Sequence, residues 1–157
     1  MRIVALVCVC IVAAFAAQSA RADGDPASDY LLVQRVFVPY EAATAAKQKR
    51  DLTAAVTAAN NAGFKIRVAV IESAYDLGSV TALWRKPQTY ARFLGAELAF
   101  VYSQRLLVVM PNGFGFNWPK HSAKAAYAML AKVRLTKGAA GLLESATAAV
   151  QALAKAG

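Results

Sequence analysis

The sequence has few side chains of the kinds that carry metal or thiol chemistry. It contains two cysteines, Cys8 and Cys10, and a single histidine, His121. Beyond residue 10 there is no thiol to form a disulfide, a reactive thiolate or a cysteine-rich metal site. One histidine also excludes zinc motifs built on paired histidines. No G-x-S-x-G motif is present, so His121 lacks the sequence context of that type of Ser-His-acid site, and Ser122 beside it is typical of a helix cap.

Acidic residues are also scarce. The chain has 9 Asp and Glu against 18 Lys and Arg, which gives a formal net charge of +9 over 157 residues. No acid-rich loop like that of an EF-hand is present. The positive charge suits acidic partners such as nucleic acid, anionic lipid or envelope polymers. Because the basic residues are scattered and the chain has the features of an exported protein, we expect no nucleic-acid partner.

Long apolar runs are absent except at the beginning of the chain. Residues 3–17 form an uncharged run of 15 residues behind Arg2, and Ala20-Arg21-Ala22 follows it. A bilayer span needs about 20 apolar residues, whereas this layout is typical of a secretory signal peptide with an A-x-A cleavage site. The sequence therefore predicts a signal peptide over 1–22 and export to the periplasm or the extracellular space. An uncleaved amino-terminal anchor is the alternative.

Removal of that leader also removes both cysteines and lowers the net charge from +9 to +7. We expect the remaining chain to have no integral membrane span, because no later segment is long and apolar enough. Its apolar content and length are sufficient for one hydrophobic core. Residues 23–29, with Gly24 and Pro26, are predicted to be a flexible linker, and residues 30–157 a single α/β domain.

The hydrophobic pattern predicts alternating strands and helices. Gly63 stands where a C-terminal helix cap is expected, Pro87 suits the first turn of a helix, and 111–113 are typical of a tight turn. The predicted strands are 35–38, 65–72 and 106–110, with a hairpin return over 114–118. The predicted helices are 44–62, one that begins at Pro87 and buries Tyr90, Phe93, Leu94, Leu98 and Val101, and two near the C-terminus.

This order indicates an α/β fold: a βαβαβ core with parallel strands, an antiparallel hairpin edge strand and two C-terminal helices. The carboxyl ends of parallel strands lie at one rim of a sheet, where open α/β folds bind ligands. Residues after the strands ending near Glu72 and Met110 should therefore meet at that rim, while His121 should lie at the opposite one.

Two candidate sites follow at the expected rim. Arg85 and Lys86 precede a helix N-terminus, where cations are unfavourable unless an anion joins them; with Asn112 and Ser73 they form a candidate anion site. The alternative is that both cations pair with acidic neighbours or point into water.

Glu72 and Asp76 offer hard oxygen ligands for Ca²⁺ or Mg²⁺. The alternative is that Asp76 is a turn residue that binds backbone N–H groups. Apart from such an ion, we expect no cofactor.

Several segments together resemble the TPM-domain family, which includes thylakoid-lumen phosphatase-like proteins and many exported bacterial proteins. They are FKIRVAVIES, DLGSV, PQTYARFLGAEL and RLLVVMPNGFGF, within about residues 35–118. The resemblance implies a βαβ-based sandwich and export. Some members are thought to bind Ca²⁺ or to hydrolyse phosphate esters through clustered aspartates. Here Asn117, Trp118 and Pro119 follow NGFGF instead of acidic residues, and Asp76 is the one plausible remnant of such a cluster.

We therefore expect an exported TPM-like domain of non-enzymatic binding type, which binds a protein partner or an acidic envelope component. One alternative is a divalent-metal-dependent phosphatase-like hydrolase that uses Glu72 and Asp76. Another alternative is a structural subunit of an envelope complex.

Overall fold

A computed structural model describes residues 24–157, together with the side chains of these residues apart from Glu41 and Thr44. The predicted signal peptide and both cysteines lie outside the described residues.

A four-stranded sheet forms the centre of the domain. Its strands are β1 (Val36–Phe37), β2 (Ile66–Val70), β3 (Arg105–Met110) and β4 (Gly113–Asn117), and they lie in the order β1-β2-β3-β4. The first three strands are parallel, and β4 pairs antiparallel with β3. This topology confirms the predicted α/β class, the parallel core and the antiparallel hairpin edge.

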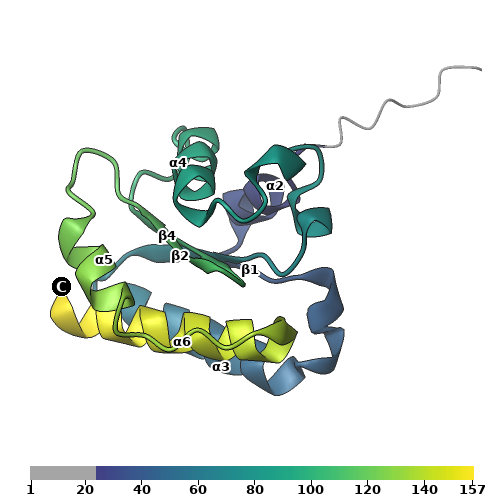
Figure 1. The fold of residues 1–157 in the computed structure, drawn as a ribbon. Coiled ribbons are helices and arrows are strands. Elements are labelled where there is room, and N and C mark those ends of the chain that lie inside the picture. Colours follow the sequence, from purple (N-terminus) through teal and green to yellow (C-terminus); the bar gives the residue numbers. More distant parts are fainter. Residues whose placement is uncertain (1–23) are drawn as a thin grey trace, which may run out of the picture.

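Helices cover both faces of this sheet (Figure 1). The helices α2 (Pro26–Val33) and α4 (Pro87–Glu97) pack on one face, while α3 (Ala46–Asn61), α5 (Lys124–Leu130) and α6 (Gly138–Ala156) pack on the other. Short 3₁₀ turns lie at Tyr40–Thr44, Ala74–Leu77 and Thr81–Leu83. The two predicted C-terminal helices are α5 and α6. Within residues 24–157, none of the helices is both long and apolar enough to cross a bilayer.

The central strands are apolar on both sides because both of their faces are covered. In β2, Ile66, Val68 and Val70 belong to the core beneath α3 and α6, whereas Ala69 belongs to the core beneath α2 and α4. The continuous apolar run of β3 divides between the same two cores. An alternating side-chain direction thus turns each strand into part of two separate cores.

The two parallel crossovers have opposite hands. From β1 to β2 to β3 the strands step in one direction across the sheet, yet α3 and α4 lie on opposite faces. A right-handed crossover at both steps would place both helices on the same face. The opposite hands allow a small sheet with only two crossover helices to be covered on both sides.

The N-terminal part of the domain differs from the expected flexible linker over 23–29. Helix α2 begins at Pro26, and Ala27 is fully buried. Asp25 caps this helix, because its Oδ1 accepts a hydrogen bond from the Ala27 N–H at 3.1 Å. Asp followed by Pro is a typical start of a helix, a signal that favours a helix over a linker.

The expected helix after Pro87 is present, with a smaller buried face than predicted. Tyr90, Leu94 and Leu98 are fully buried, and Phe93 is half-buried. Val101 was expected to point inward but is 58% exposed, because α4 ends at Glu97. The left-handed cap at Gly63 is confirmed, with a φ of 91°.

Candidate functional site

The predicted rim lies at the carboxyl ends of β2 and β3. These strands are neighbours and run parallel, with Val70 opposite Val109, so the residues that follow them leave the sheet on the same side. The segment of 72–76 follows β2, and Asn112 follows β3. The structure therefore brings the expected segments to one edge of the sheet.

Asp76 is buried at this rim and is used by the backbone around it. Its Oδ2 accepts hydrogen bonds from the backbone N–H groups of Glu72 and Ser73, both at 2.9 Å. Its Oδ1 accepts a longer hydrogen bond of 3.4 Å from the Tyr40 N–H. The carboxylate thereby holds the turn after β2 against the segment after β1. The geometry is that of the turn residue considered as an alternative to a metal ligand.

Asn112 and Arg85 are also in contact. The Asn112 Nδ2 donates a hydrogen bond of 2.7 Å to the backbone carbonyl of Arg85. Arg85 adopts a φ of 59°, a left-handed conformation that is uncommon outside glycine and that this bond helps to hold. The side chains of Arg85 and Lys86 are exposed.

A hollow of about 390 Å³ lies at this edge, between residues 86–89 and 112–114. Of the predicted anion-site residues, Lys86 and Asn112 line it; Ser73 and Arg85 do not. Among the described residues, no group of three or more His, Cys, Asp or Glu side chains is placed to hold a metal ion. The anion and metal sites at this rim therefore stay predictions.

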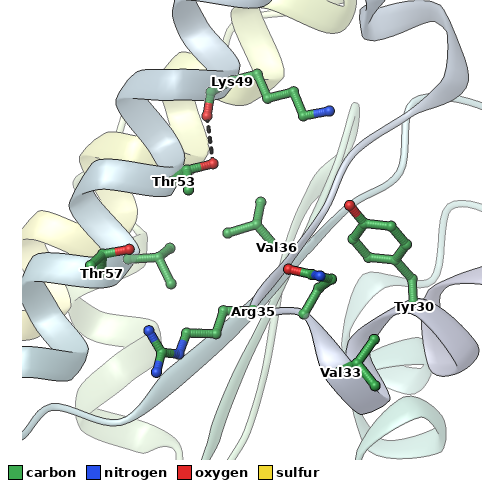
Figure 2. Close-up of a pocket in the computed structure, with 9 residues that line it drawn as sticks. Tyr30, Val33, Arg35, Val36, Lys49, Thr53 and Thr57 are labelled. Atoms are coloured by element: carbon green, nitrogen blue, oxygen red, sulfur yellow. Dashed lines mark hydrogen bonds between the residues drawn. The ribbon is translucent and has the colours of Figure 1, made fainter.

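A longer groove follows the outer edge of β1, the first strand of the sheet. Two adjoining hollows of about 390 and 430 Å³ form it, and both are lined by Tyr30 and Lys49. Helix α2 forms one wall and α3 the other, with β1 between them (Figure 2). We call this feature the β1 groove. Its lining residues are Tyr30, Val33, Gln34, Arg35, Val36, Phe37, Val38, Pro39, Tyr40, Ala42, Ala43, Ala46, Lys49, Thr53, Val56 and Thr57.

The floor of the β1 groove is an open strand edge. The Val68 N–H donates to the Arg35 carbonyl at 2.9 Å, and Val36 pairs in register with Val68. In parallel pairing, the N–H and C=O of alternate residues point to opposite sides of a strand. Arg35 and Phe37 therefore face β2, while the N–H and C=O of Val36 and Val38 point outward. No other strand of residues 24–157 pairs with that edge.

The walls of the β1 groove are fixed by contacts to the sheet. The Tyr30 ring packs edge-on against Phe37, with 5.9 Å between the ring centroids. The Arg67 guanidinium in β2 donates a hydrogen bond to the Leu31 carbonyl in α2, and this bond anchors the helix to the strand. The same guanidinium lies over the Tyr102 ring. Burial lowers the pKa of Arg67. A wall held at several points is suited to bind a partner without rearrangement.

The β1 groove combines positive charge with exposed apolar side chains. Among the described side chains that line it, the charged ones are Arg35 and Lys49, and none is Asp or Glu. Tyr30, Val33 and Tyr40 also line it, and they are 44%, 81% and 83% exposed. Exposed apolar side chains that gather around a strand edge are typical of a surface that binds another chain.

The sequence pattern did not predict this groove, because a flexible linker over 23–29 was expected where α2 begins. Without α2 the groove has only the wall formed by α3, and nothing in the sequence places Tyr30 beside β1. The signal that could have found it is Asp25-Pro26, an N-cap followed by proline at the first helical position.

Comparisons with protein-family models, with curated proteins and with solved structures found no match to this chain.

Proposed function

We propose that this chain is an exported, non-enzymatic binding domain whose β1 groove takes an extended, acidic segment of a protein partner. The observation that carries the proposal is the outward N–H and C=O edge of Val36 and Val38, flanked by Arg35 and Lys49. An added strand would hydrogen-bond to that edge, and its acidic side chains would lie near the two cations. The resemblance to the TPM-domain family also implies an exported α/β domain. Membership of that family and export both stay predictions.

The length of the edge determines what can bind. Strand β1 spans two residues, and Pro39 follows shortly after it. Short edges next to proline resist long edge-to-edge pairing, which protects the domain against aggregation. The groove therefore suits a short strand whose affinity comes from side-chain contacts with Tyr30, Val33 and Tyr40 as well as from backbone hydrogen bonds.

The test uses a fluorescent ten-residue peptide that alternates Glu with Val, and a Lys/Val peptide as its counterpart. We expect saturable binding of the Glu/Val peptide by fluorescence anisotropy, and binding of the Lys/Val peptide at least tenfold weaker. Lys49→Glu should weaken the Glu/Val peptide about tenfold or more. Lys132→Glu makes the same charge change on an exposed residue outside the groove and serves as the matched control.

A second variant tests the strand edge itself. Val36→Pro removes one outward N–H and leaves the hydrogen bonds of Arg35 and Phe37 to β2 in place. We expect weaker peptide binding with a retained circular-dichroism spectrum. Equal losses in Lys49→Glu and Lys132→Glu would show that only net charge matters. A larger loss in Arg85→Glu than in Lys49→Glu would move the binding surface to the rim after β2 and β3, where an acidic envelope polymer is the alternative ligand.

The phosphatase alternative needs a different readout. Asp76 holds the turn after β2, so loss of activity in Asp76→Ala would report on the fold as much as on chemistry. Turnover of a generic phosphomonoester that EDTA abolishes and Mg²⁺ or Ca²⁺ restores would support the hydrolase and contradict our proposal. The structural-subunit alternative predicts co-purification with one protein that survives high salt, whereas binding at the β1 groove should weaken as salt rises.

A further inference from the structure

A separate hollow of about 430 Å³ lies at the opposite end of the sheet from the predicted rim. It is bounded by the beginning of β3, the end of β4, α5 and the last turns of α6. Its apolar walls include Phe116, Met129 and Leu153, and its charged side chain is Arg105. We call it the Arg105 pocket. Its volume is within the roughly 300–1,000 Å³ that is usual for small-molecule sites.

The Arg105 guanidinium lies over the rings of two aromatic side chains. Its guanidinium carbon lies 3.7 Å from the centroid of the Trp118 ring and 4.2 Å from that of Phe64. The His121 ring stacks on that of Trp118, with 3.7 Å between the ring centroids and an interplanar angle of 20°. Contacts with two aromatic rings restrict the orientation of the guanidinium, and its N–H groups remain available for hydrogen bonds.

The positive charge of Arg105 forms no ion pair with the side chains that the structure describes. The guanidinium also makes no hydrogen bond within the described part of the chain, although each guanidinium carries five N–H donors. Burial lowers the pKa of Arg105, a sign of partial desolvation, but arginine stays charged at physiological pH. An oriented cation without a partner, beside an apolar wall, favours an anionic ligand with an apolar body.

We propose that the Arg105 pocket binds a small amphiphilic carboxylate, with an acyl or aryl body of roughly ten carbons. The carboxylate accepts two parallel N–H bonds from the guanidinium edge, and the apolar body packs against Phe116, Met129 and Leu153. Carboxylate geometry matches the guanidinium fork, whereas an alcohol has only one oxygen to offer. This site is independent of the β1 groove, so either one can fail without the other.

Titration calorimetry with decanoate, below the concentration at which it aggregates, tests this inference. We expect saturable binding at one site, with decanol bound at least tenfold more weakly and decyltrimethylammonium not bound. Trp118 lines the pocket and should report the same saturation through its fluorescence. Equal affinity for decanoate and decanol would overturn the proposal, as would the absence of saturable decanoate binding.

Two variants separate the charge from the pocket. Arg105→Met keeps the apolar contacts and removes the charge, so decanoate should bind at least tenfold more weakly while decanol is unchanged. Arg134→Met removes the same charge from an exposed residue outside the pocket and should change neither affinity. Met129→Trp fills the pocket and keeps Arg105, so it should weaken both ligands and gives a second test if Arg105→Met does not fold. Unchanged decanoate affinity in a folded Arg105→Met would refute the assignment.

Discussion

At the scale of single residues, Asp25 joins two helices that are distant in the sequence. Its Oδ1 accepts hydrogen bonds from the Ala27 N–H and from the Tyr90 hydroxyl at 2.7 Å, so it caps α2 and binds α4. The Oδ2 atom is buried and has no partner among residues 24–157. Burial, more than any nearby charge, raises the pKa of Asp25. The same burial, together with the Asp25 carboxylate, raises the pKa of Tyr90.

The raised pKa of Asp25 predicts a pH-dependent stability. The folded state holds the proton more tightly than the unfolded state, whose carboxyl has a pKa of about 3.9. The stabilisation is therefore fully present below that value and is lost as the pH rises through the folded-state pKa. Asp25→Asn keeps an acceptor for Ala27 and Tyr90 but does not titrate. We expect the stability of the wild type relative to Asp25→Asn to fall with rising pH, by at most about 1.4 kcal/mol per unit.

Urea denaturation of both proteins between pH 3.5 and 8 measures this difference directly. Subtracting the Asp25→Asn curve removes the contributions of the other acidic residues, which the two proteins share. Parallel stability curves for the two proteins across that range would contradict the buried carboxyl as the cause.

The predicted rim shows how much of a residue's role can be inferred from its type alone. The sequence indicated that Asp76 was either a metal ligand or a turn residue, and the structure shows its oxygens bound to backbone N–H groups. Asn112 was expected to face a ligand, and it binds the Arg85 carbonyl. Polar residues in turns often satisfy nearby backbone groups, and only coordinates show which groups are within reach.

At the scale of elements, α4 lies directly against β4 at a glycine. A Cβ atom at Gly115 would lie 1.9 Å from the Pro87 carbonyl oxygen and 2.9 Å from the Ala91 Cβ. At Gly95, in α4, a Cβ would instead meet the end of the Asn117 side chain. The Pro87 carbonyl is backbone at the start of α4 and cannot move without shifting the helix. The Asn117 side chain can rotate away.

Gly115→Ala and Gly95→Ala form a matched pair that tests this contact. We expect Gly115→Ala to lower the free energy of unfolding by about 3 kcal/mol, because α4 must move off the sheet. Gly95→Ala should cost less than about 1 kcal/mol, since alanine also favours the helix. Thermal or urea denaturation of both variants measures the difference. Equal losses would mean that α4 is free to shift on β4.

At the scale of the whole molecule, the sequence predicts that residues 1–22 are removed on export. The described fold begins close to that point, with Asp25 buried and capping α2. We expect the protein recovered from the periplasm or the medium to begin at Asp23, as measured by N-terminal sequencing and intact mass. Mutation of Ala20 and Ala22 to bulky residues should block this processing. Recovery of the full 16.6 kDa chain from the wild type would instead support the uncleaved anchor.

The strand order and the two-faced burial of the sheet also belong to the whole molecule. The continuous apolar run over 106–110 predicted a strand that is buried on both sides, and β3 confirms this. The strand over 65–72 was predicted from its alternating pattern, and β2 proves to be covered on both sides as well. The placement of α3 and α4 on opposite faces was not predictable, because the periodicity of a helix shows that one side is buried and not which face of a sheet covers it. The β1 groove depends on the placement of α2 and α3, and the Arg105 pocket depends on that of α5 and α6.

The sequence by itself determined the α/β class, most element positions and the rim where β2 and β3 end, because strand and helix periodicities and turn residues are local signals. Only the tertiary structure decided that α2 covers the sheet beside β1, that Asp76 accepts hydrogen bonds from backbone N–H groups, and that Arg105 lies over the rings of Phe64 and Trp118. These features join residues from separate elements, and the distance between such residues is set by packing, which no local pattern records.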